Sequence, residues 1–154
     1  MFKEMRRKDK MLTEDEMLDI LASSEYGVLS TIGDDGFPYG VPVNYVYKDD
    51  FIYFHSASTG HKLDNVANNA NVSFCVVRDV ELIPDDFNTK FKSVIAFGTV
   101  SEVAEAEKDA ILTLFLDKFS KDFIPSGMDY IKNAGPNARV FAIKVLHMSA
   151  KGKK

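Results

Sequence analysis

The stretch from residue 26 to residue 55 reads Tyr26-Gly-Val-Leu-Ser-Thr-Ile32, Gly33-Asp-Asp-Gly36, Phe37-Pro-Tyr-Gly-Val-Pro-Val-Asn-Tyr-Val-Tyr47, Lys48-Asp-Asp50 and Phe51-Ile-Tyr-Phe-His55. Runs rich in valine, isoleucine and aromatic residues predict three strands, and the glycine and aspartate runs predict tight turns between them. Such short turns indicate an antiparallel meander, because a parallel pair needs a long crossover. Proline cannot donate to a sheet ladder, so we expect an edge or a bulge near Pro42.

Outward from this meander, the sequence predicts further strands and peripheral helices. Thr13-Glu-Asp-Glu16 is a capping box that begins a helix running to about Ser23. Gly98 predicts a bulge or a close backbone approach. We expect strands over 72–77, 91–103 and 139–148, helices over 61–68 and 105–119, and irregular chain over 78–89 and 122–136. About six strands and three helices in this order predict a mainly β fold, an antiparallel barrel with peripheral α-helices.

The composition is that of a soluble globular protein. The chain has 154 residues, 45% of them hydrophobic and 27% charged, which predicts one domain over 1–154 and excludes wholesale disorder. We expect its basic N-terminal arm, 1–10, and basic tail, 149–154, to be solvated, with local anion contacts as the alternative. The net charge of -4 argues against nonspecific nucleic-acid binding. No apolar run reaches the roughly 18 residues of a membrane span.

Cysteine and histidine usage narrows the classes of chemistry. The single cysteine, Cys75, lies in an apolar run and reads as a buried small hydrophobe. The missing secretory signal and the lone thiol together predict a cytoplasmic protein. Three scattered histidines and one cysteine give no metal-site spacing, so no metal ligands are expected. The sequence also lacks nucleophile-elbow, Walker and Gly-X-Gly-X-X-Gly motifs.

The segment Phe54-His-Ser-Ala-Ser-Thr-Gly-His-Lys-Leu-Asp64 predicts an anion site. A strand ends, small residues turn the chain, and a helix begins near His61 and Lys62. Free N–H groups at a helix start attract anions, and Gly60 lets the backbone approach a ligand closely. Lys62 adds a full charge, so a phosphate monoester fits there. The alternative is a capped helix that carries a surface lysine.

The segment Tyr39-Gly-Val-Pro-Val-Asn-Tyr-Val-Tyr47 offers a wall for a flat heterocycle. Its apolar residues supply the wall, and unpaired backbone groups near Pro42 could meet a polar ring edge. Asn44 faces either a ligand or solvent, and an ordinary half-buried strand is the alternative. His55 ends the third strand and is a candidate ligand contact or proton donor, with a structural role as the alternative.

Several ordered motifs together resemble one known family. They are Arg6-Arg-Lys-Asp-Lys10, Glu25-Tyr-Gly-Val-Leu-Ser-Thr31, Asp35-Gly-Phe-Pro-Tyr39, Val41-Pro-Val-Asn-Tyr-Val-Tyr47, Ile52-Tyr-Phe-His-Ser-Ala57, Gly60-His-Lys-Leu-Asp64, Asn71-Val-Ser-Phe74, Phe91-Lys-Ser-Val94 and Gly98-Thr-Val100. The chain resembles the FMN-binding split-barrel proteins related to pyridoxamine 5'-phosphate oxidase, and among them the nitroimidazole-resistance branch. The resemblance implies a six-stranded Greek-key split barrel and a homodimer that binds FMN at its subunit interface.

The same resemblance implies roles for individual residues. His55 is the implied catalytic side chain, close to flavin and substrate. The implied FMN contacts are Val41, Val43, Asn44 and Tyr45 along the ring, His55, Ser56 and Ala57 beside the ring or ribityl chain, Gly60, His61 and Lys62 at the phosphate, Ser93 and Val94 from the other subunit, and Lys144 by its charge. The oxidases usually have Arg-Lys where this chain has His61-Lys62, which implies a weaker or pH-dependent phosphate grip. Their C-terminal substrate motif has no counterpart after Arg139, so we do not expect oxidation of pyridoxamine phosphate.

The leading hypothesis is therefore an FMN-dependent oxidoreductase that acts on a small nitroaromatic or quinone-like electron acceptor, with NADH or NADPH as the candidate donor. One alternative is a non-catalytic module that binds flavin, haem or deazaflavin. Another is a barrel that has lost its ligand and serves in assembly.

Overall fold

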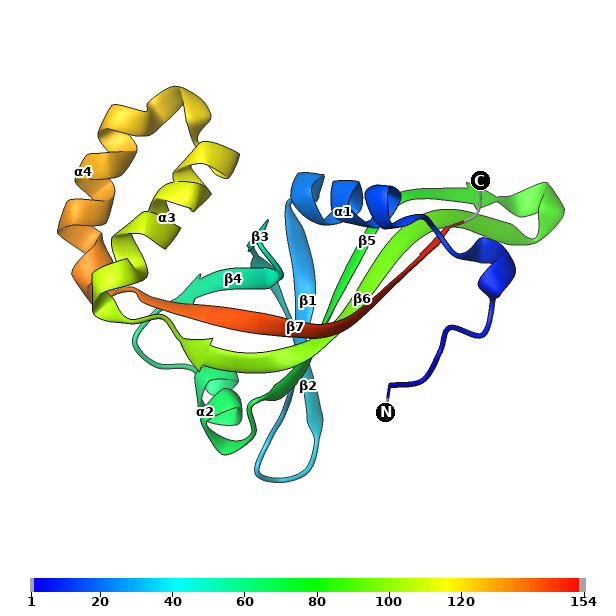
Figure 1. Cartoon of the computed structure of the whole chain (residues 1–154), viewed down its shortest axis with the longest axis horizontal. Helices are drawn as coiled ribbons and strands as arrows, with labels where there is room; N and C mark the ends of the chain where they lie inside the picture. The colour runs from blue at the N-terminus through cyan, green and yellow to red at the C-terminus, as the bar shows by residue number, and fades with distance from the viewer. Residues whose placement is uncertain (1, 153–154) are drawn as a thin grey trace.

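The computed structural model describes residues 2–152, within which seven strands form one antiparallel sheet (Figure 1). Its strand order is β2-β1-β5-β6-β7-β4-β3. The strands are β1 (Tyr26–Ile32), β2 (Pro38–Asn44), β3 (Val46–Lys48), β4 (Phe51–Ser56), β5 (Asn71–Ile83), β6 (Asn88–Glu102) and β7 (Arg139–Gly152). The helices are α1 (Glu14–Ser23), α2 (His61–Asn68), α3 (Glu105–Phe119) and α4 (Ile124–Ala134). The mainly β, antiparallel architecture agrees with the prediction.

The sheet curls into a barrel that stays split along one side. Strands β2 and β3 are separated in sequence only by Tyr45, yet they occupy opposite edges of the sheet. One continuous segment therefore supplies both edges, and the strand predicted over 37–47 becomes two. This break raises the strand count from the predicted six to seven.

The break lies at Tyr45, whereas we expected an irregularity near Pro42. Pro42 pairs regularly with Val28, and β2 is an edge strand, so its missing N–H disturbs no second neighbour. Tyr45 is fully buried, and its hydroxyl donates to the Leu21 carbonyl at 2.5 Å. Burial of this large ring draws the chain inward and ends β2.

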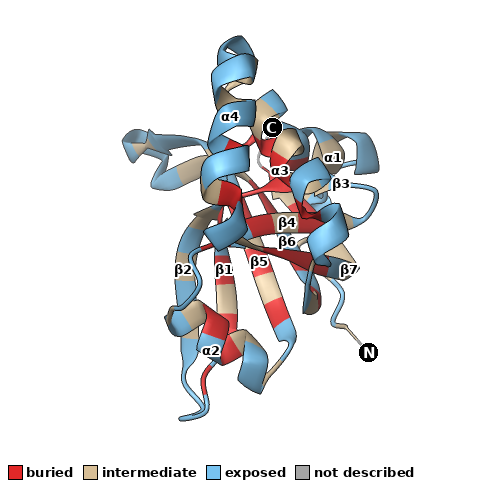
Figure 2. Ribbon diagram, turned by 90° about the vertical axis from the view of Figure 1, so that its left-hand side faces the viewer, coloured by how far each residue is buried: buried red, intermediate tan, exposed pale blue. Residues whose placement is uncertain are grey.

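The barrel interior is a continuous apolar core closed by two helices. Inward-facing residues such as Leu29, Phe54 and Phe74 alternate with outward-facing ones, as Figure 2 shows in red against blue. The predicted capping box starts α1, which contributes Ile20 and Leu21 to the core. At the other end of the barrel, α2 adds further apolar side chains (Figure 1).

A second apolar cluster lies outside the barrel, beneath α3 and α4. Leu112 and Ile131 from these helices pack against Val140 on β7. The prediction that 122–136 is irregular is wrong, because α4 occupies most of it. Pro125 lies in the first turn, where a helix needs no N–H, and Gly127 faces the Leu116 side chain.

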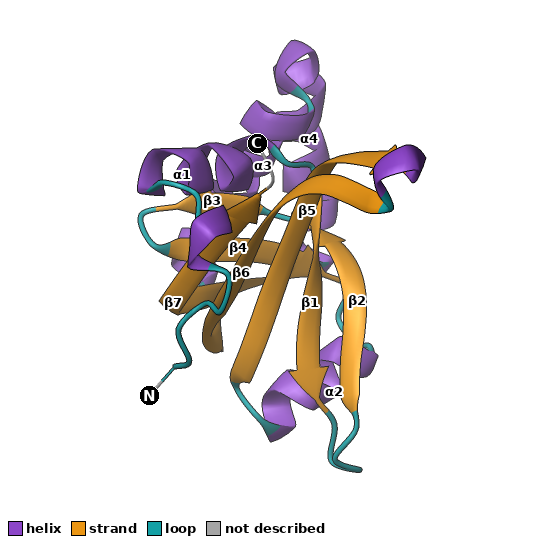
Figure 3. Ribbon diagram, turned by 90° about the vertical axis from the view of Figure 1, so that its right-hand side faces the viewer, coloured by secondary structure: helices purple, strands orange, loops and turns teal. Residues whose placement is uncertain are grey.

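The irregular chain expected over 78–89 is instead a β-hairpin, which extends beyond the barrel (Figure 3). A bulge between Arg78 and Glu81 redirects β5, with Asp79 in the left-handed region at φ 56°. The predicted irregularity at Gly98 is confirmed by a register shift between β6 and β7.

Neither terminal segment is simply solvated. Strand β7 continues to Gly152, where Lys151 pairs with Ser93, so most of the predicted basic tail belongs to the sheet. Residues 153 and 154 of that tail lie outside the described residues. In the N-terminal arm, the Phe2 ring stacks on His147 and Phe97. Among residues 2–152, no helix has the length and apolar character needed to cross a membrane.

Candidate functional site

The passage from β4 into α2 forms a corner that is open at its tip. No side chain caps α2, and Gly60 lies at its N-cap in extended conformation. A methyl group added at Gly60 would meet no atom within 4 Å, so free space borders the backbone there. The Leu63 amide donates to the Gly60 carbonyl, so the His61 and Lys62 amides and the positive end of the helix dipole face a space that an anion can enter.

Lys62 and His55 bring charge and a titratable ring to this corner. Lys62 is half-buried in the first turn of α2. Burial, and secondarily the Lys62 charge, lower the pKa of His55 below its usual value. This favours the uncharged form of the His55 ring. Its ring meets the Phe115 ring edge-on, with centroids 4.8 Å apart.

Ser56 supplies a buried polar group that has no partner among the residues described. The residue is 8% exposed, and its Oγ makes no hydrogen bond. An unpaired buried hydroxyl is costly. Its place at the start of the corner loop fits a ligand that supplies the missing partner.

Sequence reasoning missed Arg139, which holds the corner loop from β7. Its guanidinium donates to the Ser58 carbonyl at 3.2 Å and pairs with both Glu102 carboxylate oxygens at 2.8 and 2.9 Å. The residue reaches the loop because β7 pairs with β4, with Arg139 opposite Ser56. No local sequence signal gives that long-range register.

Strand β2 forms the facing wall. Val41 and Val43 are partly buried and pack against the barrel core beside the split. The Tyr39 ring, which begins the predicted wall segment but is not among the predicted contacts, stacks on the His61 ring at 4.0 Å and ties this wall to the start of α2. The structure thus places the predicted residues His55, Ser56, Ala57, Gly60, His61 and Lys62 at the corner, and Val41 and Val43 lie further along the strand that carries Tyr39.

Two of the other predicted contacts have structural partners near the end of β2. Asn44 donates from its amide to the Glu25 carbonyl at 2.9 Å. Tyr45 lies in the core, its carbonyl accepting a hydrogen bond from the Lys118 ammonium at 2.9 Å. Burial lowers the pKa of Lys118 to about 8, against the opposing effect of the Glu25 carboxylate.

The remaining predicted contacts lie elsewhere on the sheet. Val94 is fully buried in the core, and Ser93 pairs with Val77 and Lys151 toward the hairpin. Lys144 is exposed opposite Phe51, at the far end of β4 from Ser56. Within one chain the structure does not bring these residues to the corner, and their roles remain predictions.

The three histidines occupy separate environments. His55 faces α3, His61 stacks on Tyr39, and His147 stacks on Phe2. In the part of the chain that is described, no three histidine, cysteine, aspartate or glutamate side chains gather closely enough to hold a metal ion.

Comparison with solved structures shows the fold. One similar solved structure is a candidate 5-nitroimidazole antibiotic resistance protein from Bacteroides thetaiotaomicron, with a TM-score of 0.76 and 21% identity, covering 93% of this chain and 86% of that one. An FAD-binding protein from Mesorhizobium loti has a TM-score of 0.70 and 23% identity, covering 94% of this chain and 98% of that one. The haem storage protein HutZ from Vibrio cholerae has a TM-score of 0.68 and 14% identity, covering 92% of this chain and 96% of that one. At these identities the likeness shows a common fold.

Comparison with curated protein sequences finds no match. The family model for pyridoxamine 5'-phosphate oxidase matches residues 13–151, nearly the whole chain. This protein therefore belongs to the pyridoxamine 5'-phosphate oxidase family.

Proposed function

We propose that the protein binds FMN, with the phosphate at the start of α2 and the isoalloxazine ring along Val41 and Val43. The observation that carries this proposal is the uncapped start of α2, where free amides, open space at Gly60 and the Lys62 charge converge. Bound FMN would supply electron transfer to a small nitroaromatic or quinone-like acceptor, with NADH or NADPH as donor.

Each residue at the corner has a distinct part in this proposal. Lys62 neutralises phosphate charge, and His61 offers a ring N–H in an orientation fixed by Tyr39. Ser56 offers its unpaired hydroxyl to the ribityl chain or phosphate. His55, whose lowered pKa favours the uncharged ring, can donate one hydrogen bond at the reacting side of the flavin.

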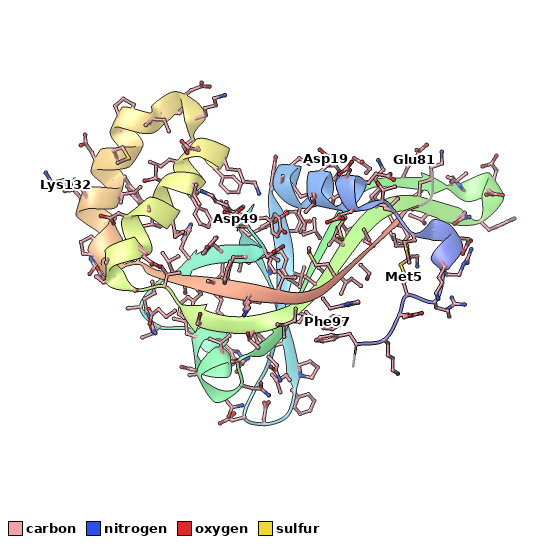
Figure 4. All side chains as sticks on the ribbon, in the orientation of Figure 1. Met5, Asp19, Asp49, Glu81, Phe97 and Lys132 are labelled. Carbon is pink, nitrogen blue, oxygen red and sulfur yellow. The ribbon has the colours of Figure 1, made fainter. Side chains whose placement is uncertain are left out.

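The phosphate placement is tested by Lys62→Glu. The substitution removes a charge-assisted contact and adds a like charge, so FMN binding should weaken by on the order of 2–4 kcal/mol, about 30- to 1,000-fold in Kd. Lys132→Glu is the matched control, because Lys132 points away from the rest of the molecule (Figure 4). Flavin-fluorescence quenching gives both affinities. Equal affinity of Lys62→Glu and wild type would refute the placement.

Turnover needs a separate test. The FMN-loaded protein is mixed anaerobically with NADH or NADPH, and flavin absorbance is followed before and after a nitroaromatic acceptor is added. The proposal expects bleaching by the nicotinamide and recovery with the acceptor. A bound flavin that accepts no electrons from either donor and passes none to the acceptor would contradict the proposed enzymatic activity and leave only the proposal that the protein binds FMN.

We also propose that the protein acts as a homodimer with FMN at its interface. The outer face of β1, β5 and β6 carries the exposed apolar side chains of Tyr26, Val28, Ile32, Val77, Ile95 and Phe97, and of these the Phe97 ring is stacked against Phe2 of the N-terminal arm. Exposed apolar surface of this extent marks an interaction site. A second copy of the chain would cover this surface. We also propose a cytoplasmic location, which suits Cys75, a half-buried cysteine whose thiol pKa is raised by burial.

Ile95→Arg tests this dimer, since it puts a charge at the centre of that face. We expect light scattering coupled to size-exclusion chromatography to give the mass of two chains for wild type and of one for the variant. Lys48→Ala, at the exposed end of β3, should stay dimeric. A wild-type protein that elutes with the mass of one chain would contradict the proposal.

A non-catalytic haem-binding module is the second candidate, because HutZ, a haem storage protein, shares the fold over 92% of this chain. The separate placement of the three histidines offers at most one axial ligand at any one place. An absorption spectrum of the purified protein distinguishes a haem band from flavin bands. A haem spectrum lost in His147→Ala and kept in His55→Ala would place haem away from the corner.

A further inference from the structure

A cavity of about 320 Å³ lies beside His55, where the end of β4 meets α3 and α4. Ligand pockets in proteins span about 300–1,000 Å³, so this volume suits a compound of one or two rings. His55 borders this cavity, and the His55 ring also lies near Lys62 of the α2 corner. The cavity therefore adjoins the place where the proposed flavin site begins.

The cavity walls are apolar. Leu112, Phe115 and Ile131 form much of the lining from the two helices. The Tyr130 side chain also borders the cavity and is 71% exposed. These aromatic and aliphatic surfaces favour a flat apolar ligand.

The polar groups at the cavity are few. They are His55, Ser56, Tyr130 and Asn137, and among residues 2–152 no aspartate, glutamate, lysine or arginine lines the cavity. An ionised ligand would lose its hydration there without gaining a charged partner in the lining, because the nearby Lys108 ammonium is already paired with Glu105 and the Ala138 carbonyl. A neutral ring with a hydrogen-bond-accepting substituent would lose little and could pair with the His55 ring N–H or the Asn137 amide.

We infer that this cavity binds the electron acceptor and selects uncharged aromatic compounds of one or two rings, rejecting their carboxylated or phosphorylated counterparts. The role of this cavity in turnover rests on the proposed flavin site. The binding itself depends only on the walls described above.

The test compares two probes that share a ring, 4-nitrobenzyl alcohol and 4-nitrobenzoate. Each is titrated into the purified protein with FMN added and, in parallel, without flavin. Binding is followed by saturation-transfer NMR on the probe. We expect the neutral probe to bind and the anionic probe to bind at least about tenfold more weakly.

Two variants locate the binding. Ala134→Phe fills the cavity from α4 and should weaken binding of the neutral probe about tenfold or more, with FMN affinity unchanged. Asn133→Phe adds the same ring one position earlier, at an exposed residue outside the cavity lining, and should bind both ligands as wild type does. Tyr130→Ala, at a residue too exposed to unfold the protein, should also weaken the neutral probe.

The outcomes separate the two proposals. Equal binding of both probes, or neutral binding that neither Ala134→Phe nor Tyr130→Ala weakens, overturns the cavity inference while leaving the flavin site intact. A protein that binds no FMN but still selects the neutral probe keeps the cavity and removes the proposed flavin function. Circular-dichroism melting checks that each variant is folded.

Discussion

The interior of the barrel and the helical cover of α3 and α4 are two apolar regions packed on opposite faces of the same strands. The interior buries its largest side chains, such as Phe54 and Phe74, almost completely. The cover encloses a smaller cluster around Leu112 and Ile131, and it leaves a cavity of about 320 Å³ beside His55.

The difference separates the part that specifies the fold from the part that can bind. A close-packed interior has no room for a ligand, and a change of side-chain volume there alters the stability of the fold. The cover is less complete, and its half-buried lysine, Lys118, reaches down to the carbonyl at the break between β2 and β3. Stability should therefore depend mainly on the barrel and ligand selection on the cover.

The largest expected contrast is between two phenylalanines. Phe74→Ala removes a ring that is 1% exposed and meets Tyr45 edge-on, so it should lower the free energy of unfolding by about 3–5 kcal/mol. Phe115→Ala should cost less, because Phe115 already borders the cavity and loses fewer contacts. Urea unfolding at one fixed protein concentration measures both. A greater loss for Phe115→Ala would contradict the comparison.

Two glycines give a smaller contrast. Gly98→Ala would press a methyl group against the Lys144 carbonyl and the Ile143 side chain on β7, at a cost of about 1–3 kcal/mol. Gly127→Ala on α4 meets only the Leu116 side chain, which can shift, and the roughly 1 kcal/mol helix preference for alanine offsets that strain. Thermal unfolding should show a lowered Tm for the first variant alone, and similar Tm values would count against a rigid barrel.

The smallest expected effect concerns Lys118, which connects the two regions. Burial lowers the pKa of Lys118 to about 8 in the folded protein, against an ordinary value of 10.5. The unfolded chain therefore binds more protons between these values, and the stability of wild type relative to Lys118→Met should rise across that window. The Lys118 side chain is only half-buried, so solvent screening keeps this rise in stability small. Urea unfolding of both proteins at about pH 7 and about pH 10 checks its sign, and a fall would contradict it.

Local patterns predicted the barrel better than its cover. The two hairpins within 26–55, the capping box at Thr13 and the irregularity at Gly98 all follow from short-range chemistry, and the structure shows each of them, whereas the single middle strand of the predicted meander is divided between the two edges of the sheet. Helix α4 escaped prediction because Pro125 and Gly127 usually break helices. Their positions, one in the first turn and one facing Leu116, remove that penalty only in the folded chain.

The candidate site was predictable as far as it is contiguous in sequence. The stretch from His55 to Lys62 contains both the strand end and the helix start, so its corner could be placed. Arg139 and Tyr39 reach the corner only through strand pairing and ring stacking between distant segments. The inward direction of Val94 likewise depends on the register of β6 against β5 and β7, which composition does not reveal.

A crystal structure of the protein with FMN tests the central claim most directly. The account predicts phosphate oxygens within hydrogen-bonding distance of the first-turn amides of α2, with the Lys62 ammonium beside them and the ring along Val41 and Val43. A flavin bound elsewhere on the barrel, with Lys62 turned into solvent, would contradict it.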